Sequence, residues 1–152
     1  MIANGRTQAG WAYAVEGKPS TMLDVALRSL RRQQAEPRQL AECAGEACVW
    51  FRELAACLAR GDCRGAVLFC ADPGLACCVA NKVPGVRAVA VGGVAQAVRA
   101  LQNLGANLLV VEMAGRTYYE CRELLRLCQE HPSDCPPGLA CVLQELDGHA
   151  HR

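Results

Sequence analysis

The stretch GAVLFCADPGLACCVANKVPGVRAVAV, residues 65–91, decides the fold of this chain. It begins with a continuous apolar run, Ala66 to Cys70, which is typical of a strand that is covered on both faces. A proline-glycine turn, a short helical segment and Pro84-Gly85 then lead to a second apolar run, Val86 to Val91. Two strands joined through a helix indicate a right-handed β-α-β crossover and therefore a parallel sheet.

The same alternation continues on both sides of this stretch. Thr21 and Asp24 resemble a capping box that would begin a helix after the first strand. Residues 38–45 fit either a weak second strand or an irregular connection. We expect further strands at residues 11–15 and 108–111, and helices at residues 21–34, 46–60, 94–104, 117–131 and 139–146. The pattern predicts an α/β fold, a three-layer α/β/α domain with an open parallel sheet of about five strands. No linker divides the chain, so residues 1–152 are expected to form one domain.

The bulk composition is ordinary for a globular protein, with 52% hydrophobic and 20% charged residues. A formal net charge of +1 argues against nucleic acid as a partner. No apolar run approaches the ~20 residues that cross a bilayer, and the first 15 residues lack the pattern of a secretory signal. The interpretation is a cytoplasmic protein with no nucleic-acid or membrane partner.

Cysteine is unusually frequent. An odd number of cysteines and the absence of a secretion signal disfavour a disulfide framework. The absence of a C-x-x-C pair disfavours a metal site, and no metal or cofactor is expected. We interpret most of these residues as small apolar core residues and treat Cys70 separately. The eleven cysteines are Cys43, Cys48, Cys57, Cys63, Cys70, Cys77, Cys78, Cys121, Cys128, Cys135 and Cys141.

Cys70 ends a predicted strand just ahead of a predicted helix. Ligands of open parallel sheets bind beyond the carboxyl ends of the strands, where the strand order reverses. A helix N-terminus favours a thiolate, which could abstract a proton from carbon or attack an electrophile. The alternative is that Cys70 is a buried structural cysteine at the end of a strand.

Residues 65–91 resemble the core of the ribose-5-phosphate isomerase B and galactose-6-phosphate isomerase family of sugar-phosphate isomerases. The family has a strand ending in cysteine, a helix ending in alanine-asparagine-lysine, and a glycine-isoleucine-arginine-alanine strand. Here Cys70, Ala80-Asn81-Lys82 and Gly85-Val86-Arg87-Ala88 fall in register without gaps. Gly105-Ala106-Asn107 resembles a later family motif.

This resemblance is strongest over residues 46–112, and residues 132–152 would form a C-terminal extension. It implies a flavodoxin-like (Rossmann-like) topology and a homodimer with active sites at the subunit interface. It also implies an enzyme of carbohydrate metabolism, an aldose–ketose isomerase (an intramolecular oxidoreductase) that binds a phosphorylated sugar or a similar small anion.

The resemblance also implies roles for individual residues. Cys70 matches the base that moves a proton between the two carbons of an enediolate. If the chain is an active isomerase, Asp72, which replaces a neutral hydroxyl of the family, would serve as the acid. The residues that would bind substrate, by backbone donors of the turn, by side-chain amides or by positive charge, are Ala71, Gly74, Leu75, Asn103, Asn107, Lys18 and Arg152.

The chain departs from the family at the turn after Cys70. The family has cysteine-glycine-threonine-glycine-isoleucine-glycine, whereas here Asp72 places a carboxylate beside the thiol and Pro73 has no N–H. The ring-opening histidine of the family falls at Asn103, and the phosphate-binding histidine of its first loop has no counterpart in residues 16–20. Two functions therefore stay open, an active isomerase and a catalytically lapsed member that works as a ligand-binding or dimeric interaction module. A cysteine-rich redox or metal protein is a third, less favoured alternative.

Overall fold

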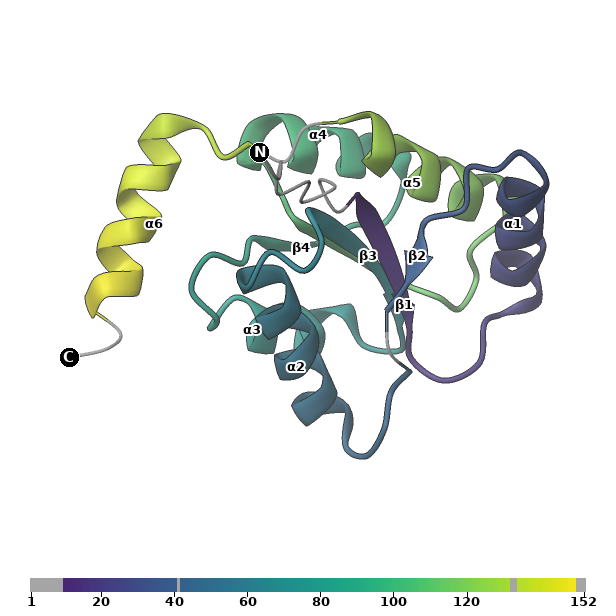
Figure 1. The fold of residues 1–152 in the computed structure, drawn as a ribbon, viewed down its shortest axis with the longest axis horizontal. Helices are drawn as coiled ribbons and strands as arrows, with labels where there is room; N and C mark the ends of the chain where they lie inside the picture. Colours follow the sequence, from purple (N-terminus) through teal and green to yellow (C-terminus); the bar gives the residue numbers. More distant parts are fainter. Residues whose placement is uncertain (1–9, 41, 132–133, 150–152) are drawn as a thin grey trace, which may run out of the picture.

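The core of the protein is one sheet of five parallel strands, with the order β2-β1-β3-β5-β4 (Figure 1). The computed structural model describes residues 10–40, 42–131 and 134–149. The strands are β1 (Trp11–Val15), β2 (Arg38–Gln39), β3 (Gly65–Cys70), β4 (Ala88–Ala90) and β5 (Leu108–Glu112). The helices are α1 (Thr21–Arg32), α2 (Ala47–Ala59), α3 (Pro73–Ala80), α4 (Val94–Leu104), α5 (Tyr118–Glu130) and α6 (Pro137–His149).

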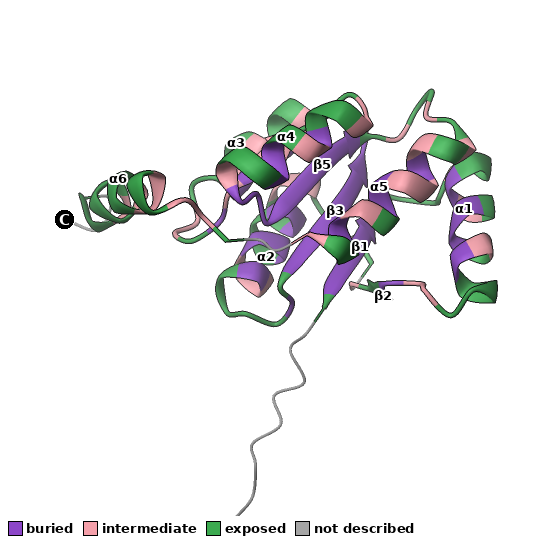
Figure 2. Cartoon of the chain, turned by 90° about the horizontal axis from the view of Figure 1, so that it is seen from above, coloured by how far each residue is buried: buried purple, intermediate pink, exposed green. Residues whose placement is uncertain are grey.

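Helices cover both faces of the sheet, so the predicted three-layer α/β/α domain is confirmed (Figures 1 and 2). Alternate side chains of β1 divide between two cores, because successive residues of a strand point to opposite faces. Trp11, Tyr13 and Val15 pack with α1, α4 and α5, whereas Ala12 and Ala14 pack with α2 and α3. β3 and β5 are buried on both faces, as their continuous apolar runs predict.

The strand order defines where a ligand site would lie. After β1 the chain crosses to β2 on one side, and after β2 it crosses back to β3 on the other side. The carboxyl ends of β1 and β3 therefore flank the topological switch point of the sheet. The last two strands are exchanged relative to the 2-1-3-4-5 order of flavodoxin itself, with β5 between β3 and β4.

Two local features correct or settle the sequence-based expectation. Helix α1 is capped by Ser20, whose hydroxyl accepts a hydrogen bond from the Leu23 N–H at 3.2 Å, so the cap lies one residue before Thr21. Of the described residues 38–40 and 42–45, Arg38 and Gln39 form a strand, which pairs with β1.

Two asparagine side chains fasten β4 to its surroundings. The Asn81 amide accepts from the Ala88 N–H at 2.8 Å and donates to the Ala88 carbonyl at 2.9 Å. The Asn107 amide accepts from the Arg87 N–H at 2.7 Å and donates to the Gly85 carbonyl at 2.9 Å. Both side-chain amides therefore act as substitutes for backbone partners around a three-residue strand.

Helix α6 lies apart from the three layers (Figure 1). None of its residues is buried, and Val142 and Leu146 are 52% and 59% exposed. Its Asp147 carboxylate accepts a hydrogen bond from the Gly85 N–H at 3.2 Å. Among the helices that the structure describes, none combines the length and apolarity needed to cross a membrane.

The cysteines have free thiols and differ in exposure. Burial fits the interpretation as core residues for Cys63, Cys70, Cys121 and Cys128, which are all buried. It does not fit Cys78 and Cys141, which are exposed, and the other five are half-buried. Over residues 10–40, 42–131 and 134–149, no three His, Cys, Asp or Glu side chains are grouped so that they could hold a metal ion.

Candidate functional site

Cys70 is the last residue of β3 and is fully buried. It pairs with Glu112 of β5, and its carbonyl accepts a hydrogen bond from the Met113 N–H at 3.0 Å. Burial raises the pKa of the Cys70 thiol to about 12, and the Glu16 carboxylate adds to the increase. A hydrogen bond from the Asp72 backbone N–H acts in the opposite direction but does not offset these effects. The thiol is therefore protonated at neutral pH and is a poor base in this state.

Glu16 accepts a hydrogen bond from Ala71, the first backbone N–H donor of the turn after Cys70. It directly follows β1, and its backbone N–H extends the β1–β3 pairing by donating to the Phe69 carbonyl at 2.9 Å. Its carboxylate oxygen Oε1 accepts a hydrogen bond from the Ala71 N–H at 3.0 Å. Ala71 was expected to help hold an enediolate oxygen, and that donor is already used by a carboxylate of the chain.

Asp72 is the N-cap of α3. Its Oδ1 accepts from the Leu75 N–H at 3.2 Å, and Pro73 fills the first helical position, where no N–H is needed. The carboxylate proposed as an acid thus has a structural role at the start of the helix. Ala71 and Leu75 thus donate to carboxylates, and Pro73 has no N–H to offer a ligand.

The remaining candidates do not all lie at the carboxyl ends of the strands, which we call the site edge of the sheet. Lys18 is exposed in the loop after β1, at the same edge as Cys70. Asn107 precedes β5 and is 8% exposed, and it lies five residues before Glu112, or ~16 Å along the strand. Asn103 is exposed near the end of α4, and Arg152 lies outside the described residues. The structure therefore brings Cys70, Ala71, Asp72, Gly74, Leu75 and Lys18 to one edge, and leaves Asn103 and Asn107 away from it.

Two residues missed by the sequence reasoning line a cavity of about 210 Å³ beside this edge, with Pro73 and the end of β4. Glu112 ends β5, and Arg116 follows it with its guanidinium held by the Gly92 carbonyl at 2.7 Å and by Glu120 at 3.2 Å. The only signal for Glu112 was its position directly after a predicted apolar strand. Gly115-Arg116 lies near the glycine-arginine that the family has after its fifth strand, but it is displaced from that position.

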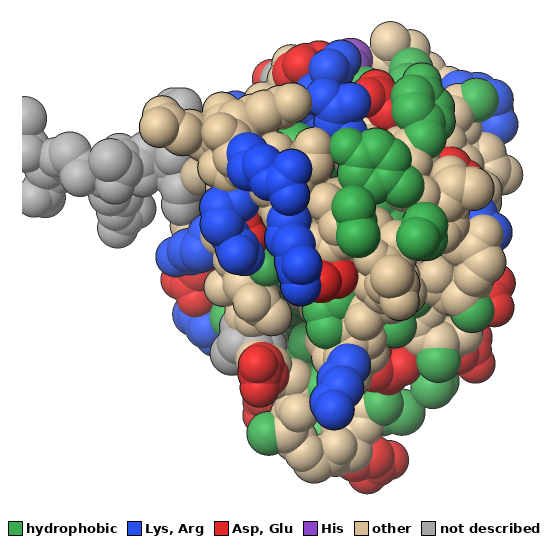
Figure 3. Space-filling model, turned by 90° about the vertical axis from the view of Figure 1, so that its right-hand side faces the viewer, with side chains coloured by type: hydrophobic (Ala, Val, Ile, Leu, Met, Phe, Trp, Pro, Cys, Tyr) green, Lys and Arg blue, Asp and Glu red, His purple; other side chains and the backbone are tan. Residues whose placement is uncertain are grey.

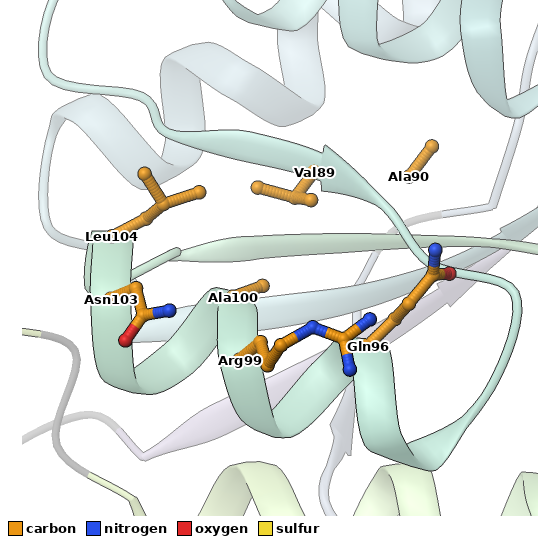
Figure 4. Close-up of a pocket in the computed structure, with 7 residues that line it drawn as sticks. All are labelled: Val89, Ala90, Gln96, Arg99, Ala100, Asn103 and Leu104. Atoms are coloured by element: carbon orange, nitrogen blue, oxygen red, sulfur yellow. The ribbon is translucent and has the colours of Figure 1, made fainter.

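A larger cavity of about 370 Å³ lies between β4 and α4 (Figure 4). Gln96, Arg99 and Asn103 extend from α4 on one side, and Val89 and Ala90 of β4 lie on the other. Asn103 thus lines a groove beside the edge strand, and no described contact connects it to Cys70.

The charge around Cys70 does not favour anions. Glu16, Asp72 and Glu112 place three carboxylates at the strand ends, beside the two cations Lys18 and Arg116. Lys and Arg side chains gather instead on the face over α1 (Figure 3), where Arg28, Arg31 and Arg32 are exposed. The Glu16 and Asp72 carboxylates both raise the pKa of Cys70, so they oppose a thiolate and would also oppose a developing enediolate.

The fold is similar to that of several solved isomerases. No model of a known protein family matches the sequence, and no curated protein matches it. The type B ribose 5-phosphate isomerase of Trypanosoma cruzi superposes with a TM-score of 0.73 at 17% identity, covering 95% of this chain and 99% of that one. The ribose 5-phosphate isomerase of Thermotoga maritima gives a TM-score of 0.71 at 14% identity, covering 91% and 98%.

Ribose-5-phosphate isomerase B from Mycoplasma genitalium, with bound ribulose-5-phosphate, gives a TM-score of 0.68 at 18% identity, covering 93% of this chain and 96% of that one. Matches at this level of identity establish the fold. The fold that the resemblance in residues 65–91 implied is thereby confirmed: the chain has the fold of the type B ribose-5-phosphate isomerases.

Proposed function

We propose that this protein is a catalytically lapsed relative of the sugar-phosphate isomerases that works as a dimeric ligand-binding module. The observation that carries the proposal is the hydrogen bond from the Ala71 N–H to the Glu16 carboxylate, next to a buried and protonated Cys70. An isomerase of this kind needs a base and free donors at that point. In this chain the thiol is protonated, and the Ala71 and Leu75 N–H groups of the turn already donate to carboxylates.

The raised pKa of Cys70 shows how small the fraction of ionised base would be. A thiol with a pKa of about 12 is ionised in on the order of one molecule in 10⁵ at pH 7. General bases work best when their pKa lies near the operating pH. A small anion such as a phosphorylated sugar, with Lys18 and Arg116 as the nearby cations, is the ligand class that the fold suggests. The cytoplasmic location stays a prediction from the sequence.

The first prediction concerns catalysis. We expect no measurable isomerisation of pentose or hexose phosphates by the wild-type protein. Asp72→Thr replaces the capping carboxylate by a hydroxyl, which can also cap the helix, and it removes a charge that raises the pKa of Cys70. The change should therefore speed the reaction of Cys70 with a thiol reagent at neutral pH. It should still yield no isomerase activity, because Asn103 cannot replace the proton transfer of a histidine. Wild-type turnover that disappears in both Cys70→Ala and Asp72→Asn would overturn the lapsed-enzyme proposal in favour of an active isomerase.

The second prediction concerns assembly. We expect a homodimer in solution at micromolar concentration, because Val142 and Leu146 expose apolar surface on a helix that none of the three layers covers. Light scattering should report twice the chain mass of 16.3 kDa. Leu146→Glu should shift the protein toward monomer, whereas Gln144→Glu, a change of an exposed polar residue on the same helix, should not. A wild-type protein that scatters only as a monomer would contradict this part of the proposal.

A further inference from the structure

The position of Glu16 is fixed by a backbone hydrogen bond as well as by its side-chain contact. Its N–H continues the β1–β3 pairing through the Phe69 carbonyl, so the side chain starts from the switch point of the sheet. The residue is half-buried, and its carboxylate reaches the loop after β3. The contact joins two segments that are 55 positions apart in the sequence.

The hydrogen bond between the Ala71 N–H and the Glu16 carboxylate is not part of a strand pairing or of a helix cap. Helix α3 begins at Pro73 and already has its own cap in Asp72. Ala71 lies outside both β3 and α3, and it is exposed. Its N–H would be open to solvent or to a ligand if the Glu16 carboxylate were absent. Backbone N–H groups of this kind, in a turn before a helix, are the donors that bind phosphate and other oxyanions.

We infer that Glu16 is a specificity-determining residue of this edge: its carboxylate occupies the oxyanion position on the Ala71 N–H and excludes external anions from it. The inference rests on the proposed function only for the location of the ligand site. A carboxylate is itself an oxyanion, so it satisfies the same donor that a phosphate or carboxylate ligand would use. It also adds a negative charge that repels such a ligand. An anion can bind at Ala71 only when Glu16 moves away.

Three variants separate these two effects, with inorganic phosphate as the probe and the Ala71 amide NMR signal as the readout. Glu16→Ala frees the donor and removes the charge. Glu16→Gln removes the charge but keeps an acceptor for the Ala71 N–H. Glu53→Ala removes a carboxylate from an exposed position of α2 and is the control for net charge.

Glu16→Ala should bind phosphate about tenfold more tightly than the wild-type protein, with a saturable shift of the Ala71 amide. Glu16→Gln should gain less than Glu16→Ala, and Glu53→Ala should match the wild type. Equal gains in Glu16→Ala and Glu16→Gln would overturn the inference, because charge alone would then explain the effect. The inference would also be overturned if Glu16→Ala bound phosphate no more tightly than the wild type, or if phosphate bound without shifting the Ala71 amide signal.

Amide hydrogen exchange tests the same contact in the wild-type protein. The Ala71 N–H should exchange more slowly than expected for an exposed loop residue, because it donates to Glu16. Exchange at the rate of a free amide would overturn the inference without any variant. Neither readout requires turnover or a dimer, so isomerase activity in the wild-type protein would refute the proposed function while leaving this inference standing.

Discussion

Gly65→Ala is expected to destabilise the folded protein by ~1–3 kcal/mol, the range for overpacking a closed core. Gly65 begins β3 directly opposite Trp11 of β1, and both residues are buried. A Cβ atom at Gly65 would lie 2.6 Å from two carbon atoms of the Trp11 ring. Because the ring is enclosed by the sheet and its helices, it cannot move aside without cost. Urea denaturation followed by tryptophan fluorescence or circular dichroism would measure the change.

A double-mutant cycle would identify the indole ring as the cause. In a Trp11→Leu background the smaller side chain leaves room, so adding Gly65→Ala should cost much less than in the wild type. Gly138→Ala is the matched control, since a Cβ atom there meets nothing within 4 Å and alanine favours the helix α6. An equal loss of stability in both backgrounds would show that the contact with Trp11 is not the reason.

Asn107→Ala is expected to lower the free energy of unfolding by about 2–4 kcal/mol. The side-chain amide accepts from the Arg87 N–H and donates to the Gly85 carbonyl. A buried polar group that loses its hydrogen-bond partner destabilises the folded protein by ~1–3 kcal/mol. Asn103→Ala changes an exposed residue and should stay within ~0.5 kcal/mol of the wild type. Thermal or chemical denaturation of both variants gives the comparison.

These two asparagines were both candidates for binding substrate, so the pair of variants separates a structural role from a ligand role. If Asn107→Ala were as stable as the wild type but lost a ligand, the structural role assigned to its amide would be wrong. The buried position of Asn107 and its use of both amide groups lead us to expect the opposite result.

Most of the fold could be predicted because helices and buried strands have strong local patterns. The apolar runs at Ala66–Cys70 and Leu108–Val111 fell on strands, and the helical spacing of Cys121, Leu124, Leu125 and Cys128 fell on the buried face of α5. The order of the strands could not be derived from local patterns, because pairing of β5 between β3 and β4 depends on contacts between distant segments. The cap of α1 was misplaced by one residue because Ser20 and Thr21 are both good capping residues.

The candidate site was harder to predict than the fold. Cys70 and Asp72 were located correctly at the strand end and the helix start, since both positions follow from a continuous pattern in one segment. Glu16 was missed because its contact with Ala71 exists only once β1 and β3 are paired. Asn107 was a candidate because of a sequence motif, and a motif does not show at which end of its strand a residue lies. The structure places Asn107 just before β5, away from Cys70.

The pairing of Asn81 with Ala88 has a consequence for solubility. The outer edge of β4 is the side on which another strand could add, and the Ala88 N–H and carbonyl that face it are bonded to the Asn81 side chain. Further along, the Gly92 N–H donates to the Gln96 side chain. Unpaired edge strands are templates for aggregation, and short or covered edges resist it. The Asn81 side chain therefore forms the hydrogen bonds that an additional strand would form with Ala88. By covering this edge, a single side-chain amide helps to prevent edge-to-edge pairing between the sheets of separate molecules.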